Sequence, residues 1–261
     1  MNEPQSPSDL AFRGDAAVMR GVVRRTREGA LMVRETPDRR SFWFGHGYEI
    51  AEQPSTRRLT ELARLGRERF GAIPGTQRFV ILDEHASGAY PLLDALPPNT
   101  TAQREHVMRY EATVPRLTEW EATPVAGVAD WATIGALLAA DASPEIAAFQ
   151  HWAVGVWERA ATAGFARFVA VRCDGAIRGY AGLFASPDGS LARFCTPITE
   201  PAYRGRGIFS ACANALIRAA VAHGARDIVI CAEAQSANEH LYAGLGFKVA
   251  ADIDSYIVKL D

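Results

Sequence analysis

The chain has 261 residues and a net charge of −2, with 28 lysines and arginines against 30 aspartates and glutamates. Hydrophobic residues make up 48% and charged residues 22%, which is typical of a folded chain of one large domain or two small ones. Basic and acidic residues nearly balance, 17 against 16 over residues 1–120 and 11 against 14 over residues 121–261. We therefore expect no nucleic-acid partner, because such binding needs a basic surplus.

The cysteines and the N-terminal residues argue against a disulfide, a metal site and a membrane partner. The four cysteines lie 17 or more residues apart and show no ligand spacing, so we expect reduced, buried thiols and no metal. The first residues are polar and acidic, and no apolar run approaches the length of about 18 residues that spans a membrane. We expect a cytoplasmic protein.

The first half, residues 1–119, predicts a small α/β domain. Leu59 and Leu62 belong to an apolar stripe at helical spacing that begins behind Ser55. Residues 120–131 are rich in small and chain-breaking residues and are interpreted as a connector to a second domain at 120–261. The elements expected in the first half are a strand at 41–50, a helix at 55–71 and a strand at 78–84.

The second half predicts two helices, then an antiparallel meander of three strands, and then alternating helices and strands. Asp-Gly pairs at Asp174 and Asp188 are typical of tight hairpin turns between apolar runs. This order predicts an α+β fold with a mixed, mostly antiparallel twisted sheet flanked by helices. The expected helices are 130–140, 144–164, one beginning near Phe209, and 238–246; the expected strands are 167–172, 177–185, 191–198, 227–233 and 255–260.

The glycine-rich loop Arg204-Gly205-Arg206-Gly207 runs directly into the helix near Phe209. The first amides of a helix have no internal partners and carry the positive end of its dipole, and glycines let a ligand approach the backbone. Two arginines add charge that phosphate oxygens can share. The loop therefore predicts an anion-binding cradle, although a plain turn with solvated arginines explains the same four residues. The spacing is not that of a nucleotide-hydrolysing loop.

Together with the segment Asn238–Phe247, NEHLYAGLGF, this loop resembles the GNAT superfamily of N-acetyltransferases over roughly residues 128–259. The family's loop reads Arg or Gln, two residues, Gly, one residue, then Gly or Ala, and Phe209 stands where the small residue is expected. The resemblance implies direct transfer of an acetyl group from acetyl-CoA to a primary amine, in a ternary complex and without a metal. The acceptor is a small-molecule or peptide amine whose identity the sequence does not give.

The resemblance also implies roles for particular residues. Tyr242 matches the tyrosine that protonates the departing thiolate, although packing on a short helix explains it as well. The expected acetyl-CoA contacts are Ile198 and Thr199 on a strand that splays from its neighbour, Arg204, Gly205, Arg206, Gly207, Ile208, Phe209 and Ser210 in the cradle, and Asn238, which alternatively caps its helix.

A general base must deprotonate the amine, and the sequence offers only candidates for it. Glu200 and Glu233 end the two strands beside the expected acetyl site, while exposed carboxylates are the plainer interpretation of both. His240 is a further candidate. His151 lies in an apolar run and is expected in the core or the acceptor pocket. The nearby aromatic residues Phe149, Trp152 and Trp157 are expected mainly in the core.

Residues 1–119 lack both motifs but repeat the strand–helix–strand order, so we interpret them as a degenerate, partial copy of the same fold that packs against the catalytic half. In this half His46 is expected to satisfy a local hydrogen bond. The alternative function is a non-catalytic acyl-CoA-binding regulatory module. An interaction protein without a ligand, and a homodimer paired through sheet edges, are also left open.

Overall fold

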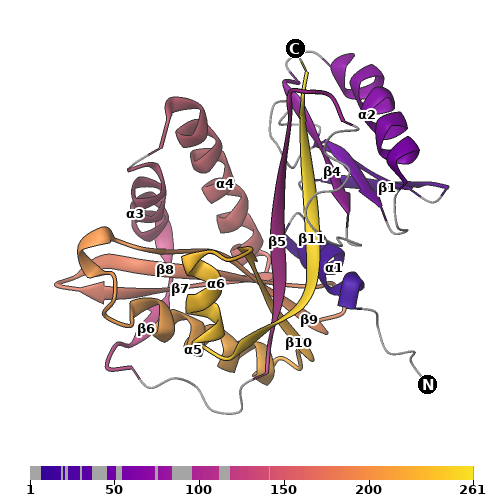
Figure 1. Ribbon diagram of the computed structural model, residues 1–261. Helices are drawn as coiled ribbons and strands as arrows, with labels where there is room; N and C mark the ends of the chain where they lie inside the picture. The colour runs from indigo at the N-terminus through magenta and orange to yellow at the C-terminus, as the bar shows by residue number, and fades with distance from the viewer. Residues whose placement is uncertain are drawn as a thin grey trace.

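The computed structural model describes residues 7–18, 20, 23–29, 31–36, 46–50, 55–73, 76–83, 96–111, 118–140 and 142–260. They form one eleven-stranded mixed sheet with helices on both faces (Figure 1). The helices are α1 (Pro7–Val18), α2 (Thr56–Gly71), α3 (Gly127–Ala139), α4 (Pro144–Thr162), α5 (Ile208–Ala222) and α6 (Ala237–Ala243). The strands are β1 (Arg24–Glu28), β2 (Leu31–Glu35), β3 (Gly47–Ile50), β4 (Arg78–Asp83), β5 (Thr100–Tyr110), β6 (Ala122–Pro124), β7 (Ala166–Cys173), β8 (Ala176–Ala185), β9 (Leu191–Thr199), β10 (Asp227–Glu233) and β11 (Phe247–Lys259).

The strand order shows that the two halves of the chain share this sheet. It runs β1-β2-β3-β4-β11-β5-β10-β9-β8-β7-β6. The two long strands β5 and β11 lie side by side and antiparallel at the centre (Figure 1). Thus β5 of the first half pairs with β10 of the second, and β11 of the second half pairs with β4 of the first.

The two halves also repeat one arrangement. In the first half a hairpin, β1–β2, is followed by β3, α2, β4 and β5, and in the second half the hairpin β7–β8 is followed by β9, α5, β10, α6 and β11. In each half the strand after the long helix pairs in parallel with the strand before it, β4 with β3 and β10 with β9. The last strand of each half is inserted into the other half's part of the sheet.

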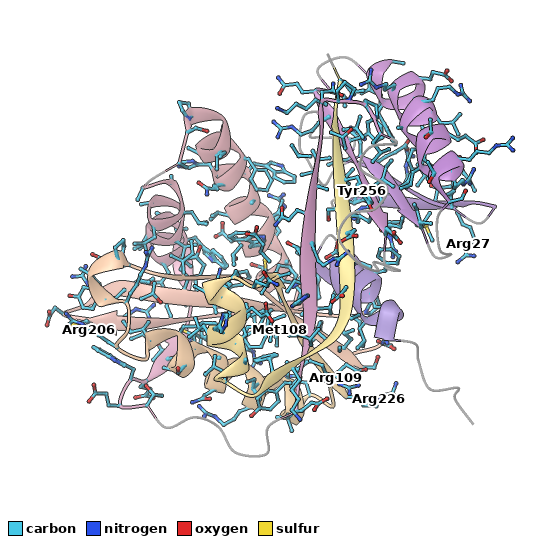
Figure 2. The ribbon with its side chains drawn as sticks, viewed as in Figure 1. Arg27, Met108, Arg109, Arg206, Arg226 and Tyr256 are labelled. Atoms are coloured by element: carbon cyan, nitrogen blue, oxygen red, sulfur yellow. The ribbon has the colours of Figure 1, made fainter. Side chains whose placement is uncertain are left out.

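The hydrophobic cores likewise combine residues from both halves of the chain. Met108 of β5 is buried in the core under α5 and α6, and Tyr256 of β11 is buried in the core under α2 (Figure 2). Under α2 the sheet comes so close that a Cβ on Gly66 would lie 2.3 Å from the Phe79 ring. Two further cores lie under α3 and α4 and under α1, where the halves meet. Each half therefore completes the core of the other.

Several predicted elements need correction. The expected connector at 120–131 contains β6 and the first turn of α3, and the strand expected at 255–260 is only the end of the 13-residue β11. A polar stretch in the middle of β11 hides its length from sequence patterns. The strand expected at 41–50 is present over Gly47–Ile50, while residues 41–45 lie outside the described residues. The elements α1, β1, β2 and β5 were not expected.

The remaining predicted elements of the second half agree with the structure to within a few residues. Both Asp-Gly turns are present, with Asp174 and Gly175 at φ of 51° and 78° and Gly189 at 70°. The four cysteines carry free thiols, but only Cys212 is fully buried, whereas the sequence predicted buried thiols for most of them. Within the described part of the chain, no helix is long and apolar enough to cross a membrane, and no group of three or more potential ligands is placed to hold a metal.

Candidate functional site

The glycine-rich loop forms the N-terminus of α5. Gly205 and Gly207 adopt φ of 73° and 81°, the left-handed region that glycine enters without strain. Gly207 is the N-cap residue, and no side chain caps the helix. The first amides of α5, on Ile208, Phe209 and Ser210, therefore have the arrangement that suits an anion.

Side chains surround this loop on two sides. Arg206 is exposed at the edge of the molecule (Figure 2), with its guanidinium stacked 5.2 Å from the centre of the Tyr203 ring. Arg204 donates from Nε to the Thr199 carbonyl at 3.3 Å. The Trp120 indole N–H donates to the Arg206 carbonyl at 2.7 Å, and Thr118 donates to the Gly207 carbonyl at 3.4 Å. The segment that joins the two halves therefore supports the loop through these two hydrogen bonds. The sequence did not indicate this role, because Trp120 was expected to belong to a connector.

Beside the loop, β9 and β10 part, as the resemblance to the GNAT superfamily implies. Their parallel pairing ends at Arg193 and Val229 in the described residues, whereas β9 continues to Thr199. An irregularity of the β8–β9 pairing, with Thr196 at φ of 42°, bends β9 at this point. Ile198 and Thr199 remain paired to β8, so the opposite edge of β9 faces the opening between the strands.

Tyr242 lies at this opening, on the short helix α6. It is 4% exposed, and its ring centre is 5.5 Å from that of Phe209. Burial raises the pKa of the Tyr242 phenol to about 12, so that it carries its proton throughout the neutral range. The cap of α6 is Ser236, whose hydroxyl accepts from the Glu239 amide at 3.2 Å, so the expectation that Asn238 caps this helix is wrong; Asn238 is exposed.

A large cavity opens on the other side of the parted strands. Its volume is about 890 Å³, and it is enclosed by α1 and α4, by β9 and β10, and by β2, β4, β5 and β11. Cys195 and Cys231 line it from the parted strands, and Tyr242 lines it from α6. Both halves of the chain therefore build its walls. This volume falls in the range of about 300–1,000 Å³ that is usual for small-molecule sites.

The carboxylates expected from the sequence to act as base do not line this cavity. Glu200 is half-buried and bound to Arg178, with Oε2 and Nη1 2.8 Å apart, and Glu233 is exposed at the end of β10. His240 is exposed, with its ring held by the Ser236 carbonyl at 2.8 Å. His151 is also exposed and bound to the Ala147 carbonyl, so the expectation that it lies in the core or the pocket is wrong, because it faces away from the apolar stripe of α4.

Glu105 of β5 does line the cavity, together with Tyr242. It lies on a central strand, opposite Glu233 on one side and Ile253 on the other. Burial raises the pKa of the Glu105 carboxyl; Arg193 opposes this rise, and the nearby charges of Asp15 and Glu233 add to it. Glu105 could not be predicted from the sequence, because the polar stretch around it shows no strand alternation and the first half carries no motif.

The aromatic residues of α4 form one wall of the cavity. Phe149 and Trp152 are half-buried and contact each other at a ring distance of 5.6 Å, and Trp157 is buried against Phe168 at 5.7 Å. These three residues of α4 all line the cavity, so they belong to its wall as well as to the hydrophobic core.

In the first half, the ring of His46 does not make the expected local hydrogen bond within the described residues. The ring is buried and stacked on Phe70, with the ring centres 5.4 Å apart.

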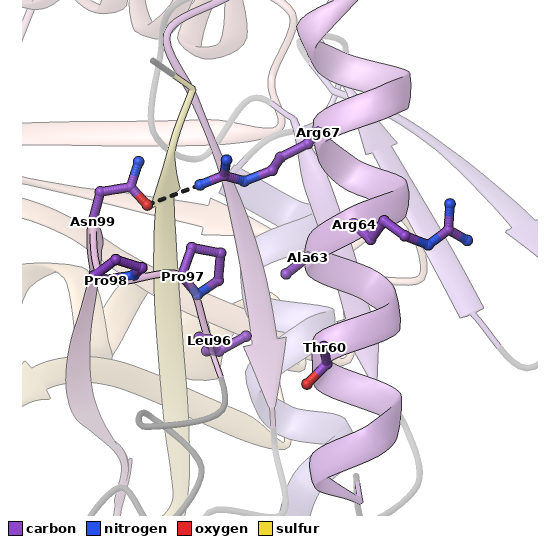
Figure 3. A pocket seen from close by; sticks show the side chains of 8 residues that line it. All are labelled: Thr60, Ala63, Arg64, Arg67, Leu96, Pro97, Pro98 and Asn99. Carbon is purple, nitrogen blue, oxygen red and sulfur yellow. Dashed lines mark hydrogen bonds between the residues drawn. The ribbon is translucent and has the colours of Figure 1, made fainter.

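A second hollow lies in the first half, between α2 and the segment before β5 (Figure 3). Its volume is about 600 Å³, and the side chain of Arg67 crosses it to bind Asn99 Oδ1 at 2.9 Å (Figure 3). None of the residues predicted for the site lines it. The parted strands and the cavity behind them are therefore the better candidate.

Part of the chain matches a known family. Residues 131–247, which contain the loop, the parted strands and Tyr242, match the family model described as the acetyltransferase (GNAT) family. Over this segment the chain resembles the GNAT acetyltransferase family. Members of the GNAT family catalyse acyl transfer and in general bind acetyl-CoA.

Solved GNAT proteins share the fold over almost the whole chain. A GCN5-related N-acetyltransferase from Kribbella flavida has a TM-score of 0.69 at 16% identity and covers 98% of this chain and 96% of its own. A putative GNAT acetyltransferase from Novosphingobium aromaticivorans has a TM-score of 0.61 at 20% identity, covering 98% and 99%. A tandem GNAT protein from the clavulanic acid biosynthesis pathway has a TM-score of 0.58 at 10% identity, covering 95% and 88%. No curated protein matches the chain in sequence.

Proposed function

We propose that the protein is an acetyl-CoA-dependent N-acetyltransferase that acetylates a primary amine held in the cavity between its halves. The observation that carries this proposal is the position of Tyr242: it lies at the parted strands beside the α5 loop and also lines the cavity on their other side. Acetyl-CoA would bind with its phosphates at the amides of Ile208 to Ser210 and its thioester between β9 and β10. The amine would enter from the cavity.

The reaction needs three proton transfers. Glu105 would accept one proton from the ammonium group, and the free amine nitrogen would attack the thioester carbonyl carbon. As the carbon–sulfur bond breaks, the Tyr242 hydroxyl would protonate the leaving thiolate and take up the second proton, which the nitrogen loses as it becomes an amide. Because its pKa is raised to about 12, Tyr242 holds this proton at neutral pH and is suited to the role of an acid rather than a base.

The first test measures release of the CoA thiol from acetyl-CoA with a broad panel of primary amines. Tyr242→Phe should lower kcat about 100-fold, within the usual range for one acid–base group, with little change in acetyl-CoA affinity. Tyr110→Phe is the matched control, because Tyr110 packs against the same Phe247, at 5.3 Å, without lining the cavity. Equal activities of the wild type and Tyr242→Phe would contradict the role of Tyr242.

One observation favours the alternative of a non-catalytic acyl-CoA-binding module. Phe209 lies in the first turn of α5, where the family has a small residue, and its ring packs on that of Tyr242 at 5.5 Å. If the wild type binds acetyl-CoA in calorimetry but transfers nothing to any amine in the panel, this alternative replaces the enzyme. Failure to bind acetyl-CoA would exclude both.

A further inference from the structure

The helix α6, which carries Tyr242, is attached to the rest of the molecule through few side chains. Of its seven residues, Ala237–Ala243, only Glu239 and Tyr242 are not exposed. A helix this short is not stable by itself in water, so contacts with other elements must hold it in place. Tyr242 packs on Phe209 and Phe247 at ring distances of 5.5 and 6.5 Å. Glu239 provides the second attachment.

Both carboxylate oxygens of Glu239 have partners. Oε2 accepts from the Gln235 amide at 2.5 Å, and Oε1 lies 3.1 Å from Nδ1 of His106. Burial acts to raise the pKa of the Glu239 carboxyl, but the Gln235 amide and His106 outweigh it, so the pKa is lowered and the group is charged at neutral pH. Gln235 has φ of 62°, a left-handed conformation that is uncommon for a residue with a side chain. Glu239 therefore also stabilises the bend by which the chain enters α6.

His106, the partner of Glu239, belongs to the other half of the chain. It lies on β5, opposite Ala232 of β10 and Asp252 of β11. Its Nε2 lies 3.5 Å from Asp252 Oδ1, so the ring, whose side chain is 18% exposed, lies between two carboxylates. Two positions earlier on β5, the Arg104 carbonyl accepts from the Ala234 amide at 3.0 Å. The first half thus holds the segment around the start of α6 through its main chain and through a side chain.

The strand β5 contributes to the site from both of its faces. Neighbouring residues of a strand point to opposite faces of the sheet. Met108 lies in the core under α5 and α6, and His106, two positions away, shares its face, whereas Glu105 lines the cavity. Glu239 and Tyr242 are three positions apart and lie on one side of α6. A change in the contact between His106 and Glu239 would therefore shift Tyr242.

We infer that His106 is a positioning residue: through Glu239 it holds α6 in the orientation that places the Tyr242 hydroxyl at the parted strands. This inference rests on the proposed function, in which Tyr242 protonates the leaving thiolate. Proton transfer needs donor and acceptor at hydrogen-bond distance, so a small shift of α6 slows this step. His106 lies outside the α5 loop, so the affinity for acetyl-CoA should change little.

Kinetics and calorimetry on the full chain test the inference. His106→Leu removes both contacts of the ring and should lower kcat about 10-fold, with little change in the Kd of acetyl-CoA. His106→Asn should recover most of the loss, because its amide nitrogen can take the place of Nδ1. Arg104→Leu is the matched control: Arg104 joins β5 to β11 through two hydrogen bonds of 2.8 Å to Asp254, and its loss should leave kcat unchanged.

A double substitution separates positioning from a general loss of stability. In the Tyr242→Phe background, His106→Leu should cause little further loss of kcat, because the hydroxyl that His106 positions is already absent. The same fold loss in both backgrounds would show that His106 acts on another part of the reaction and would overturn the inference. A loss of kcat in Arg104→Leu as large as that in His106→Leu would overturn it as well.

Hydrogen exchange provides a measurement that does not depend on activity. Glu239→Ala removes the same contact from a half-buried position and covers the case in which His106→Leu does not fold. In either variant the amides of α6 should exchange about 10-fold faster than in the wild type, and those of α5 should not change. Unchanged exchange in α6 would contradict the inference while the proposed function stands. Faster exchange in a protein that acetylates no amine would sink the proposed function and leave the attachment of α6 in place.

Discussion

Glu105 is the residue on which the proposed chemistry depends most. It lies on the central strand β5, between β10 and β11, where the cavity meets the parted strands. Burial disfavours its charged form, the charges of Asp15 and Glu233 add to this effect, and Arg193 opposes it. A carboxyl whose pKa is raised is a stronger base than an exposed carboxyl.

The prediction at this scale is that Glu105→Gln lowers kcat/KM about 100-fold. Only the ionised carboxyl accepts a proton, so wild-type activity should rise with pH through the raised pKa of Glu105, above the ordinary range of a glutamate. The variant should lose this step in the pH–rate profile. Glu233→Gln is the control: it removes the exposed neighbour, which should lower the pKa of Glu105 and shift the step to lower pH. A step unchanged in Glu105→Gln would assign the base to another group.

The N-terminus of α5 is the element that would hold the cofactor. Gly207 takes the left-handed conformation at the N-cap, and a Cβ there would lie 3.4 Å from the Thr118 hydroxyl. Any other residue would pay about 1–2 kcal/mol for this conformation, and the chain would relieve the strain by turning the first amides of α5. The direction of those amides, more than the two arginines, sets the fit to a phosphate group.

The prediction at this scale is that Gly207→Ala weakens acetyl-CoA binding about 10-fold, with a smaller effect on kcat at saturation. Gly189→Ala is the matched control, since Gly189 has φ of 70° in a hairpin turn with open space around its Cβ position. Both variants should lose similar free energy of unfolding in urea titrations, and only Gly207→Ala should change the dissociation constant. Unchanged binding would show that the cradle does not hold the phosphates.

At the scale of the whole molecule, the two halves depend on each other through their exchanged strands. Without β5, the strand β11 loses a neighbour along eleven paired positions, from Phe247 to Val258, and β10 becomes an edge. Removal of the first half takes Met108 from the core under α5, and removal of the second half takes Tyr256 from the core under α2. Neither half has a closed core of its own.

We therefore predict that residues 118–261 expressed alone do not give a cooperatively unfolding protein. The same fragment co-expressed with residues 1–111 should co-purify with it as a complex and regain activity, because the strand exchange needs no covalent link. Size-exclusion chromatography and thermal unfolding provide the measurement, with the intact chain as reference. A monomeric, cooperatively folded 118–261 fragment would show that the halves are independent domains.

The sequence by itself determined the loop at 204–207, the helix that follows it and almost every element after residue 126. These features depend on contacts a few residues apart: apolar spacing along a helix, Asp-Gly turns, and the Ser143 cap before Pro144. The same local signals placed Tyr242 on a short helix. They also gave the repeated order of strand, helix and strand in the first half.

Only the tertiary structure decided which residues line the cavity together with Tyr242. Glu105 comes opposite Glu233 through a pairing between strands far apart in the chain, and no local pattern encodes that register. Asp15 and Arg193 meet in the same way, through α1 lying against β9. A cavity built from two halves is a property of their packing, so its lining, and with it the proposed base and acceptor, follows from long-range contacts alone.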